Sequence, residues 1–303
     1  MIKKILLTLT FVFITIGEFV FAQNITGNQT DKLNSAYRIK VGFYNTQNLF
    51  DTINQPMVRD GEYTPEGKKN WNTAKYSEKL GRLANVIDQI DCDVVGLCEI
   101  ENYGVVRDLT KLTENTNFAV EHYETTDFRG IDQALIYDTT KFNVISSELV
   151  PTATHRPKRG LLRVEMQCKV TGKQMVFYVA HLPSKLGGDK AAKSRDTIIN
   201  QFGALNRMEM KRDANRGRVV MIIGDMNNDV IEIDGMNNLA APLEKMGVGT
   251  YLYRRVWSML DQVLISDWAC VSKLSVKTPN NIKINGRTVR GSDHLPVYFH
   301  LEL

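Results

Sequence analysis

Apolar runs that end in polar side chains recur along this chain. The clearest run covers residues 219–223 and is followed closely by Asp225 and Asn227. A run of this length and composition predicts a fully buried strand. Residues two apart in a strand point to the same side, so the carboxylate and the carboxamide are expected to face one spot at the end of a sheet. A strand that simply stops at an Asp-rich turn, with Asn228 and Asp229 next, is the alternative explanation.

Other apolar runs carry polar side chains at their ends in the same way. These polar residues are Asn45 after 39–44, Glu99 after 93–98, His181 after 175–180, Asp261 before 262–265, and Asp293 with His294 before the last predicted strand. Turn chemistry alone does not account for so many acidic, amide and imidazole groups at strand ends. We therefore expect them to meet at one edge of the fold.

The remaining pattern predicts an α/β protein. The spacing of apolar residues predicts helices over 76–90, 105–114 and 190–212. Further strands are predicted over 118–123, 133–137, 144–150, 161–170 and 175–180. Two sets of strands with helices beside each predict two sheets packed face to face with helices outside. Because no repeat, low-complexity tract or linker interrupts the pattern, residues 38–303 are expected to form one domain.

The strand ends resemble the endonuclease/exonuclease/phosphatase superfamily. The motifs that carry the resemblance are FYNTQNLFD, VVGLCEIEN, VAHLPSK, GDMNND, LDQVLIS and GSDHLPV, in this order along the chain. YNTQNLFD, EIEN, RGIDQALIY and HLPSKLGG are similar to the secreted bacterial nuclease-like members. The resemblance implies a four-layer α/β/β/α sandwich of two packed mixed sheets, with the active site at the edge where strand ends of both sheets converge.

Phosphodiester hydrolysis needs a cation that neutralises the phosphate, an activated water and a proton for the leaving oxygen. Glu99 is the best candidate for the cation ligand, with Asn45 and Asp293 as further oxygen donors. An all-oxygen set suits Mg²⁺ or Mn²⁺ better than Zn²⁺. Glu101 is the nearest competitor for this role, and a surface position for Glu99 is the plain alternative.

The catalytic candidates follow from the same resemblance. His294 is expected beside the phosphate, with Asp261 holding its imidazole. Asp225 is expected to accept a proton from the attacking water or to orient it, and Asn227 to hydrogen-bond a phosphate oxygen. His181 is expected to protonate or steady the leaving group. Which histidine is the acid and which the base stays open.

Basic residues supply candidates for substrate binding. Lys185 lies in a basic stretch over 185–195, and a second stretch covers 155–163. A solvated loop is the usual explanation for such stretches. Arg129 and Asp132 precede a predicted strand, where the arginine would meet phosphate and the aspartate would lie beside His181, unless the segment is only a turn.

The N-terminus carries an export pattern. Residues 1–22 combine two lysines, an apolar stretch too short for a membrane span and a small residue before Gln23, which predicts a signal peptide. An uncleaved membrane anchor is the alternative. Residues 23–37 are expected to be a flexible lead-in, and no later window predicts a transmembrane segment. The net charge of +4 is too small to indicate a nucleic-acid protein by itself.

Cysteine usage adds little to this picture. Cys92, Cys98, Cys168 and Cys270 have no metal-type spacing. Cys98 lies within an apolar run and is expected in the core, and a Cys92–Cys98 pair within one strand would be too long for a disulfide. Disulfide status stays open.

The sequence thus favours a secreted or periplasmic, Mg²⁺-dependent phosphodiesterase that acts on nucleic acid. We expect a DNase-like endonuclease that is monomeric. Two alternatives stay open: a phosphatase or phospholipase C-type hydrolase of an inositol phosphate or sphingomyelin, and a non-catalytic nucleic-acid-binding module. DNA against RNA, internal against terminal cleavage and the biological role are undecided.

Overall fold

The computed structural model describes residues 37–154, 159–212, 217–277, 282–284, 287–289 and 291–303. The expected signal peptide, nearly all of the expected lead-in and residues 155–158 of the basic stretch lie outside the described residues. Residues 36–303 form one compact unit. In the described part of the chain, we find no helix of the length and apolar character that crossing a membrane requires.

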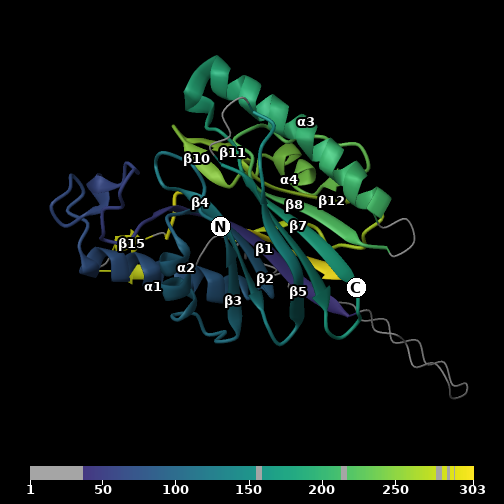
Figure 1. Cartoon of the computed structure of the whole chain (residues 1–303), viewed down its shortest axis with the longest axis horizontal. Coiled ribbons are helices and arrows are strands. Elements are labelled where there is room, and N and C mark those ends of the chain that lie inside the picture. The colour runs from purple at the N-terminus through teal and green to yellow at the C-terminus, as the bar shows by residue number, and fades with distance from the viewer. Residues whose placement is uncertain (1–36, 155–158, 213–216, 278–281, 285–286, 290) are drawn as a thin grey trace, which may run out of the picture. The chain divides into compact units, whose positions relative to one another are not determined.

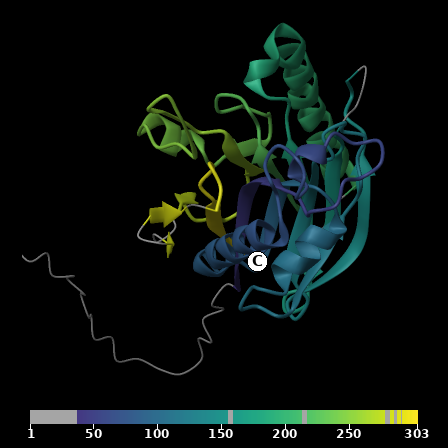
Figure 2. The same ribbon diagram turned by 90° about the vertical axis from the view of Figure 1, so that its left-hand side faces the viewer.

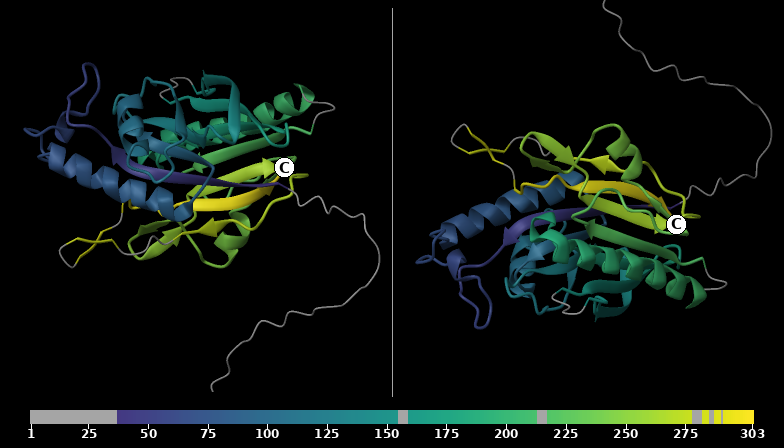
Figure 3. Two further views of the ribbon diagram at one scale, coloured as in Figure 1. Left: turned by 90° about the horizontal axis from the view of Figure 1, so that it is seen from below. Right: turned by 90° about the horizontal axis from the view of Figure 1, so that it is seen from above.

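The first sheet has six strands in the order β13-β16-β1-β2-β4-β3. Their bounds are β1 Arg38–Leu49, β2 Val94–Ile100, β3 Phe118–His122, β4 Asp132–Asp138, β13 Ser275–Val276 and β16 Val297–Glu302. β1 runs parallel to β2 and antiparallel to β16. Figure 3 shows the first strand (purple) beside the last (yellow), so the two ends of the unit meet in one sheet.

The second sheet also has six strands, in the order β5-β6-β7-β8-β12-β9. Their bounds are β5 Phe142–Val150, β6 Leu161–Cys168, β7 Gln174–His181, β8 Val219–Asp225, β9 Met236–Asn238 and β12 Asp261–Ser266. β7 and β8 are parallel, whereas β12 is antiparallel to β8. Both sheets are therefore mixed, as expected.

Helices cover the outer face of each sheet. α1 (Thr73–Ile90) and α2 (Tyr103–Thr110) pack on the first sheet, and α3 (Gly188–Arg212) packs on the second. Figures 1 and 2 show α1 and α3 on opposite sides of the strands. The smaller elements are η1 Gly61–Tyr63, η2 Lys185–Gly187, α4 Ala241–Lys245, and two hairpins, β10 Tyr251–Tyr253 with β11 Val256–Ser258 and β14 Ile282–Ile284 with β15 Arg287–Val289. The predicted four-layer α/β/β/α sandwich is confirmed.

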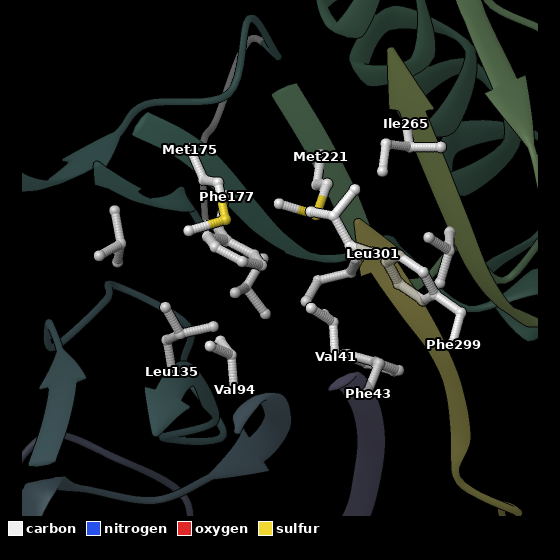
Figure 4. Close-up of a cluster of buried hydrophobic side chains, with 14 of the residues drawn as sticks. Val41, Phe43, Val94, Leu135, Met175, Phe177, Met221, Ile265, Phe299 and Leu301 are labelled. Carbon is white, nitrogen blue, oxygen red and sulfur yellow. The ribbon is translucent and has the colours of Figure 1, made fainter. Parts of the chain in front are cut away.

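Strand alternation builds the core between the sheets. Phe43 of β1, Phe177 of β7 and Met221 of β8 all lie in this central cluster, which Figure 4 shows. Their neighbours one residue away point outward to the helices, as Tyr178 does beneath α3. Burial of both faces explains why these strands read as nearly continuous apolar runs.

Local chemistry sets the helix ends. Asn72 caps α1 by accepting a hydrogen bond from Lys75 N at 3.1 Å, so the helix begins three residues before the predicted start. α2 is capped by Asn102 and ends at Thr110, earlier than predicted. All four cysteines are free, and Cys98 is buried in the core as predicted.

Candidate active site

Strand register brings three of the predicted site residues into one row on the second sheet. His181, at the end of β7, pairs with Asp225 at the end of parallel β8, and Asp225 pairs with Asp261 at the start of β12. All three share the strand parity of the central apolar cluster, so their side chains face the first sheet. The row is therefore a consequence of register, not of proximity in sequence.

Asn45 completes the row from the first sheet. Its Nδ2 donates a hydrogen bond to Oδ2 of Asp225 at 3.0 Å, with both residues buried. Its Oδ1 accepts the backbone N–H of Gln47 at 2.8 Å. The carboxamide therefore joins the two sheets at their open edge.

Oδ2 of Asp225 lies at the centre of the site. It is 3.8 Å from Nε2 of His181 and 3.8 Å from Nε2 of His294. Burial raises the pKa of Asp225 to about 7, although the nearby His294 opposes the shift. A carboxyl group that titrates near neutrality is suited to accept and release a proton.

His294 is held from its other ring nitrogen. Nδ1 lies 2.7 Å from Oδ2 of Asp261, and both side chains are buried. Burial alone would lower the pKa of His294, but Asp261, followed by Asp225 and Asp293, raises it to about 10. The ring of Tyr251 lies beside the imidazole, with the centroids 4.8 Å apart. His294 is therefore an oriented cation at neutral pH.

His181 has the opposite character. Burial lowers its pKa well below the ordinary value, and the positive charges of Arg159, Arg129 and His294 add to this effect. Its Nδ1 is buried without a hydrogen-bond partner. The two histidines of the site are thus in different charge states at neutral pH.

Glu99 reaches the site through an irregular backbone. Leu97, two residues earlier in β2, points to the helices, and regular strand alternation would direct Glu99 to the same side. However, the β2 register shifts between Cys98 and Ile100, and Glu99 has a φ of 60°. This bulge redirects the side chain, so Oε1 lies 3.7 Å from Nε2 of His181.

Asn227 also has a positive φ, of 45°. Its backbone N–H donates to Oδ1 of Asp225 at 2.9 Å, and its Nδ2 donates to the carbonyl of Leu182 at 3.0 Å. The carboxamide lies in the site as predicted, but one of its two N–H groups holds the segment after β7. Asn227 therefore also orients Asp225.

Asp293 lies at the exposed rim of the site. Its backbone N–H donates to Oε1 of Gln47 at 2.9 Å.

Lys79, which the sequence did not single out, donates from Nζ to the Gln47 carbonyl at 2.7 Å. Burial lowers the pKa of Lys79 to about 8, while Glu99 and Asp293 oppose the shift. A regular helix position gives no signal that such a lysine faces an active site.

Arginines approach the site from the loop before β4 and the segment before β6. Asp127 accepts a hydrogen bond from Nε of Arg159 at 2.8 Å and lies 3.9 Å from Nε of Arg129. Burial, followed by Arg159, lowers the pKa of Arg129, while Glu99 opposes the shift. Arg129 is thus near the site as predicted, and Arg159 of the basic stretch 155–163 joins it.

The expectation that Asp132 lies beside His181 is wrong. Asp132 lies 3.1 Å from Nε2 of His122 and accepts the backbone N–H of Thr125. The next residue, Gln133, has the parity of the central cluster, and both polar atoms of its carboxamide are buried without a partner. Adjacent strand residues face opposite sides of a sheet, so an error of one position selects the wrong side chain.

Lys185 lies away from the buried centre. Its Nζ is 2.7 Å from Oδ1 of Asp229, and both side chains are exposed. The structure therefore gives Lys185, the first residue of η2, a surface ion pair.

The acidic side of the site fits a divalent cation. Oε2 of Glu99 accepts the backbone N–H of Asn48 at 2.8 Å. Among the residues that the structure describes, Oε1 has only the 3.7 Å approach to His181, which leaves it able to bind a cation. Asn45 and Asp293 would add oxygen donors, and such a set suits Mg²⁺ or Mn²⁺. Asp225, Asp261 and His294 are also close enough to share a cation, but a protonated His294 that is bonded to Asp261 is a poor ligand.

Known proteins share both the sequence pattern and the fold. The family model described as Endonuclease/Exonuclease/phosphatase family matches residues 40–287. No curated protein matches the chain in sequence. A truncated TDP2 of Caenorhabditis elegans superposes with a TM-score of 0.64 at 14% identity, covering 88% of this chain and 98% of that one.

Two further structures are similar to this chain. A mannosyl-6-phosphatase of Bacteroides thetaiotaomicron has a TM-score of 0.64 at 15% identity, covering 88% of this chain and 100% of that one. D. rerio TDP2 complexed with single strand DNA product has a TM-score of 0.61 at 16% identity, covering 88% and 99%. At these identities the likeness concerns the fold.

Proposed function

The chain belongs to the endonuclease/exonuclease/phosphatase family, and from this premise we propose that it is a Mg²⁺- or Mn²⁺-dependent phosphoric-ester hydrolase that cleaves nucleic acid. The observation that carries the hydrolase assignment is the position of Asp225, whose Oδ2 lies 3.8 Å from two imidazoles and 3.0 Å from the Asn45 carboxamide. Three other segments of the chain converge on this one oxygen.

The different charge states of the site's side chains give them different roles in hydrolysis. Protonated His294 donates from Nε2 to a phosphate oxygen, and Asp261 holds the ring so that it keeps this direction. Asp225 accepts the proton of the attacking water as the new phosphorus–oxygen bond forms. Neutral His181 hydrogen-bonds the departing oxygen, which takes its proton from bulk water. A divalent cation at Glu99 would neutralise phosphate charge.

Positive side chains beside this centre fit an anionic, extended substrate. Arg129 and Arg159 lie near His181, and Lys79 lies near Glu99 and Asp293. Nucleic acid presents phosphates on both sides of the scissile bond, so it can engage more than one of these groups. The fold is shared with a protein complexed with single strand DNA product, which is consistent with such a substrate.

A sugar phosphate is a second candidate substrate, because the fold is shared equally well with a mannosyl-6-phosphatase. A substrate panel separates the two. We expect the purified protein to cleave DNA or RNA with Mg²⁺ or Mn²⁺, and EDTA to abolish cleavage. Intact nucleic acid with release of phosphate from a hexose phosphate, an inositol phosphate or a lipid headgroup would reject the nuclease assignment. Binding of nucleic acid without turnover would reject the assignment of this protein as an enzyme.

We also propose that the protein is exported and acts as a monomer. Support for export comes only from the residue pattern of 1–22. Fractionation of producing cells tests export, and light scattering of the purified protein tests the monomer.

A further inference from the structure

A short hairpin extends from the active site. β10 and β11 pair Tyr251 with Ser258 and Tyr253 with Val256. The hairpin is anchored beside the catalytic histidine, because Tyr251 forms a β-bridge with His294. In Figure 1 it lies at one end of the strands of the second sheet.

Its rings form a column that begins at the catalytic imidazole. The ring of Tyr251 is 4.8 Å from that of His294, and the ring of Tyr253 is 6.5 Å further, nearly parallel at 9°. The guanidinium of Arg254 lies 5.2 Å from the centre of the Tyr253 ring. The column thus leads from the site of chemistry to a cation at the hairpin tip. We name it the Tyr251–Arg254 column.

Alternation separates this column from the other hairpin face. Leu252 pairs with Trp257, and both point away from the side that carries Tyr251 and Tyr253. Tyr253 is 49% exposed and Trp257 is 39% exposed. The hairpin therefore has two aromatic faces, of which one is continuous with the active site.

The backbone of the hairpin turn is strained, because both of its central residues are arginines with positive φ. Arg254 and Arg255 have φ values of 47° and 68°. Two-residue turns with positive φ favour Asn-Gly, and side chains with a Cβ are strained there. The turn nevertheless presents two exposed arginines, and residues 251–258 contain no acid. Aromatic rings combined with arginines match a ligand that carries both planar groups and phosphates.

We propose that the Tyr251–Arg254 column binds the bases of an unpaired polynucleotide next to the scissile phosphate, while Arg254 and Arg255 contact its backbone. This inference rests on the proposed function and narrows it to single-stranded or locally unpaired nucleic acid. A paired base would keep its faces covered by its neighbours in the duplex, whereas an unpaired base can stack on Tyr253.

The binding test is fluorescence anisotropy of a labelled single-stranded oligonucleotide in EDTA, which prevents cleavage. Tyr253→Ala should weaken binding about tenfold or more, whereas Tyr253→Phe should retain it. An abasic oligonucleotide of equal length should not distinguish Tyr253→Ala from the wild type. Arg254→Ala/Arg255→Ala should weaken both ligands and reduce the salt slope by about 1.4, as expected for two lost phosphate contacts.

Trp257→Ala is the matched control, because it removes an aromatic side chain from the same hairpin but from the opposite face. Equal binding by Tyr253→Ala and wild type, or equal weakening by Trp257→Ala and Tyr253→Ala, would overturn the inference. So would binding to phosphatidylglycerol vesicles that Trp257→Ala abolishes, without oligonucleotide binding by the wild type.

Failure of this inference and failure of the proposed function give different results. If the wild type cleaves oligonucleotides but Tyr253→Ala binds them normally, only the column is rejected. If the wild type cleaves no nucleic acid at all, the proposed function itself is rejected.

Discussion

Nδ1 of His294 lies 2.7 Å from Oδ2 of Asp261, although the two residues are 33 positions apart in the chain. The contact directs Nε2 of the same ring toward Asp225, 3.8 Å away. Asp261 of β12, His294 and Asp225 of β8 thereby form one buried row of polar groups, in which Asp261 orients the imidazole that faces Asp225.

Replacement of Asp261 tests whether this carboxylate orients and charges His294. Asp261→Asn keeps the shape but removes the anion, so the pKa of His294 should fall from about 10 toward its ordinary value. Hydrolysis should fall by at least ~100-fold, the usual size of the loss when one preorganised hydrogen-bond donor to the transition state is removed. NMR titration of His294 and steady-state rates measure the two effects. An unchanged His294 pKa in the variant would contradict the assigned pairing.

Replacement of the central groups tests the roles of His294 as hydrogen-bond donor and of Asp225 as base. His294→Ala, which removes the donor to phosphate, and Asp225→Ala, which removes the base, should each lower the rate by at least ~100-fold. His300→Ala is the control, because this histidine is exposed on β16. Circular dichroism checks that the variants fold. Turnover close to that of the wild type in either central variant would reject the mechanism.

Glu99 and Glu101 should respond differently to the loss of their charge. Glu99→Gln should raise the Mg²⁺ concentration for half-maximal activity by tenfold or more, since a carboxylate ligand is lost. Glu101 instead accepts the backbone N–H of Asp51 at 2.6 Å, and burial raises its pKa to about 8. Glu101→Gln should therefore leave the Mg²⁺ requirement unchanged. Calorimetric titration with Mg²⁺ or Mn²⁺ provides a readout independent of activity.

A buried ion pair beneath α3 should govern acid stability. Glu209 accepts hydrogen bonds from Nε of Arg163 and the hydroxyl of Tyr178, both at 2.8 Å. Burial alone would raise the pKa of Glu209, but these bonds hold it below its ordinary value of 4.5. Glu209→Ala leaves a buried guanidinium with fewer partners and should cost about 3–5 kcal/mol of unfolding free energy.

The sign of the pH dependence follows from the lowered pKa. At a pH between the folded-state and the unfolded-state pKa of Glu209, the unfolded protein binds a proton that the folded protein does not. The stabilisation by Glu209 is therefore lost on acidification. The stability difference between wild type and Glu209→Gln should be complete above about pH 4.5 and shrink as the pH falls through the folded-state pKa. Urea unfolding at several pH values measures it, and a constant difference would contradict the assignment.

Individual residues mark how far sequence reasoning reached. Asp225 and Asn45 were predictable, because apolar runs with polar ends are visible in the sequence and strand ends of packed sheets converge. Asp132 was chosen where its neighbour Gln133 has the parity of the central cluster, because a motif does not reveal strand parity. Lys79 and Tyr251 carried no signal, since a helix and a short hairpin contain many similar residues. Arg159 was visible only as one of several basic residues in the stretch 155–163.

The amino-acid sequence by itself determined the family pattern, the buried strands and the polar groups at their ends, because these depend on apolar periodicity and local residue type. Only the tertiary structure decided which side chains meet. A bulge turns Glu99 toward His181, register aligns His181 with Asp225, and the β10–β11 hairpin sets Tyr251 against His294. These contacts depend on packing between distant segments, where a shift of one residue reverses the direction of every side chain in a strand.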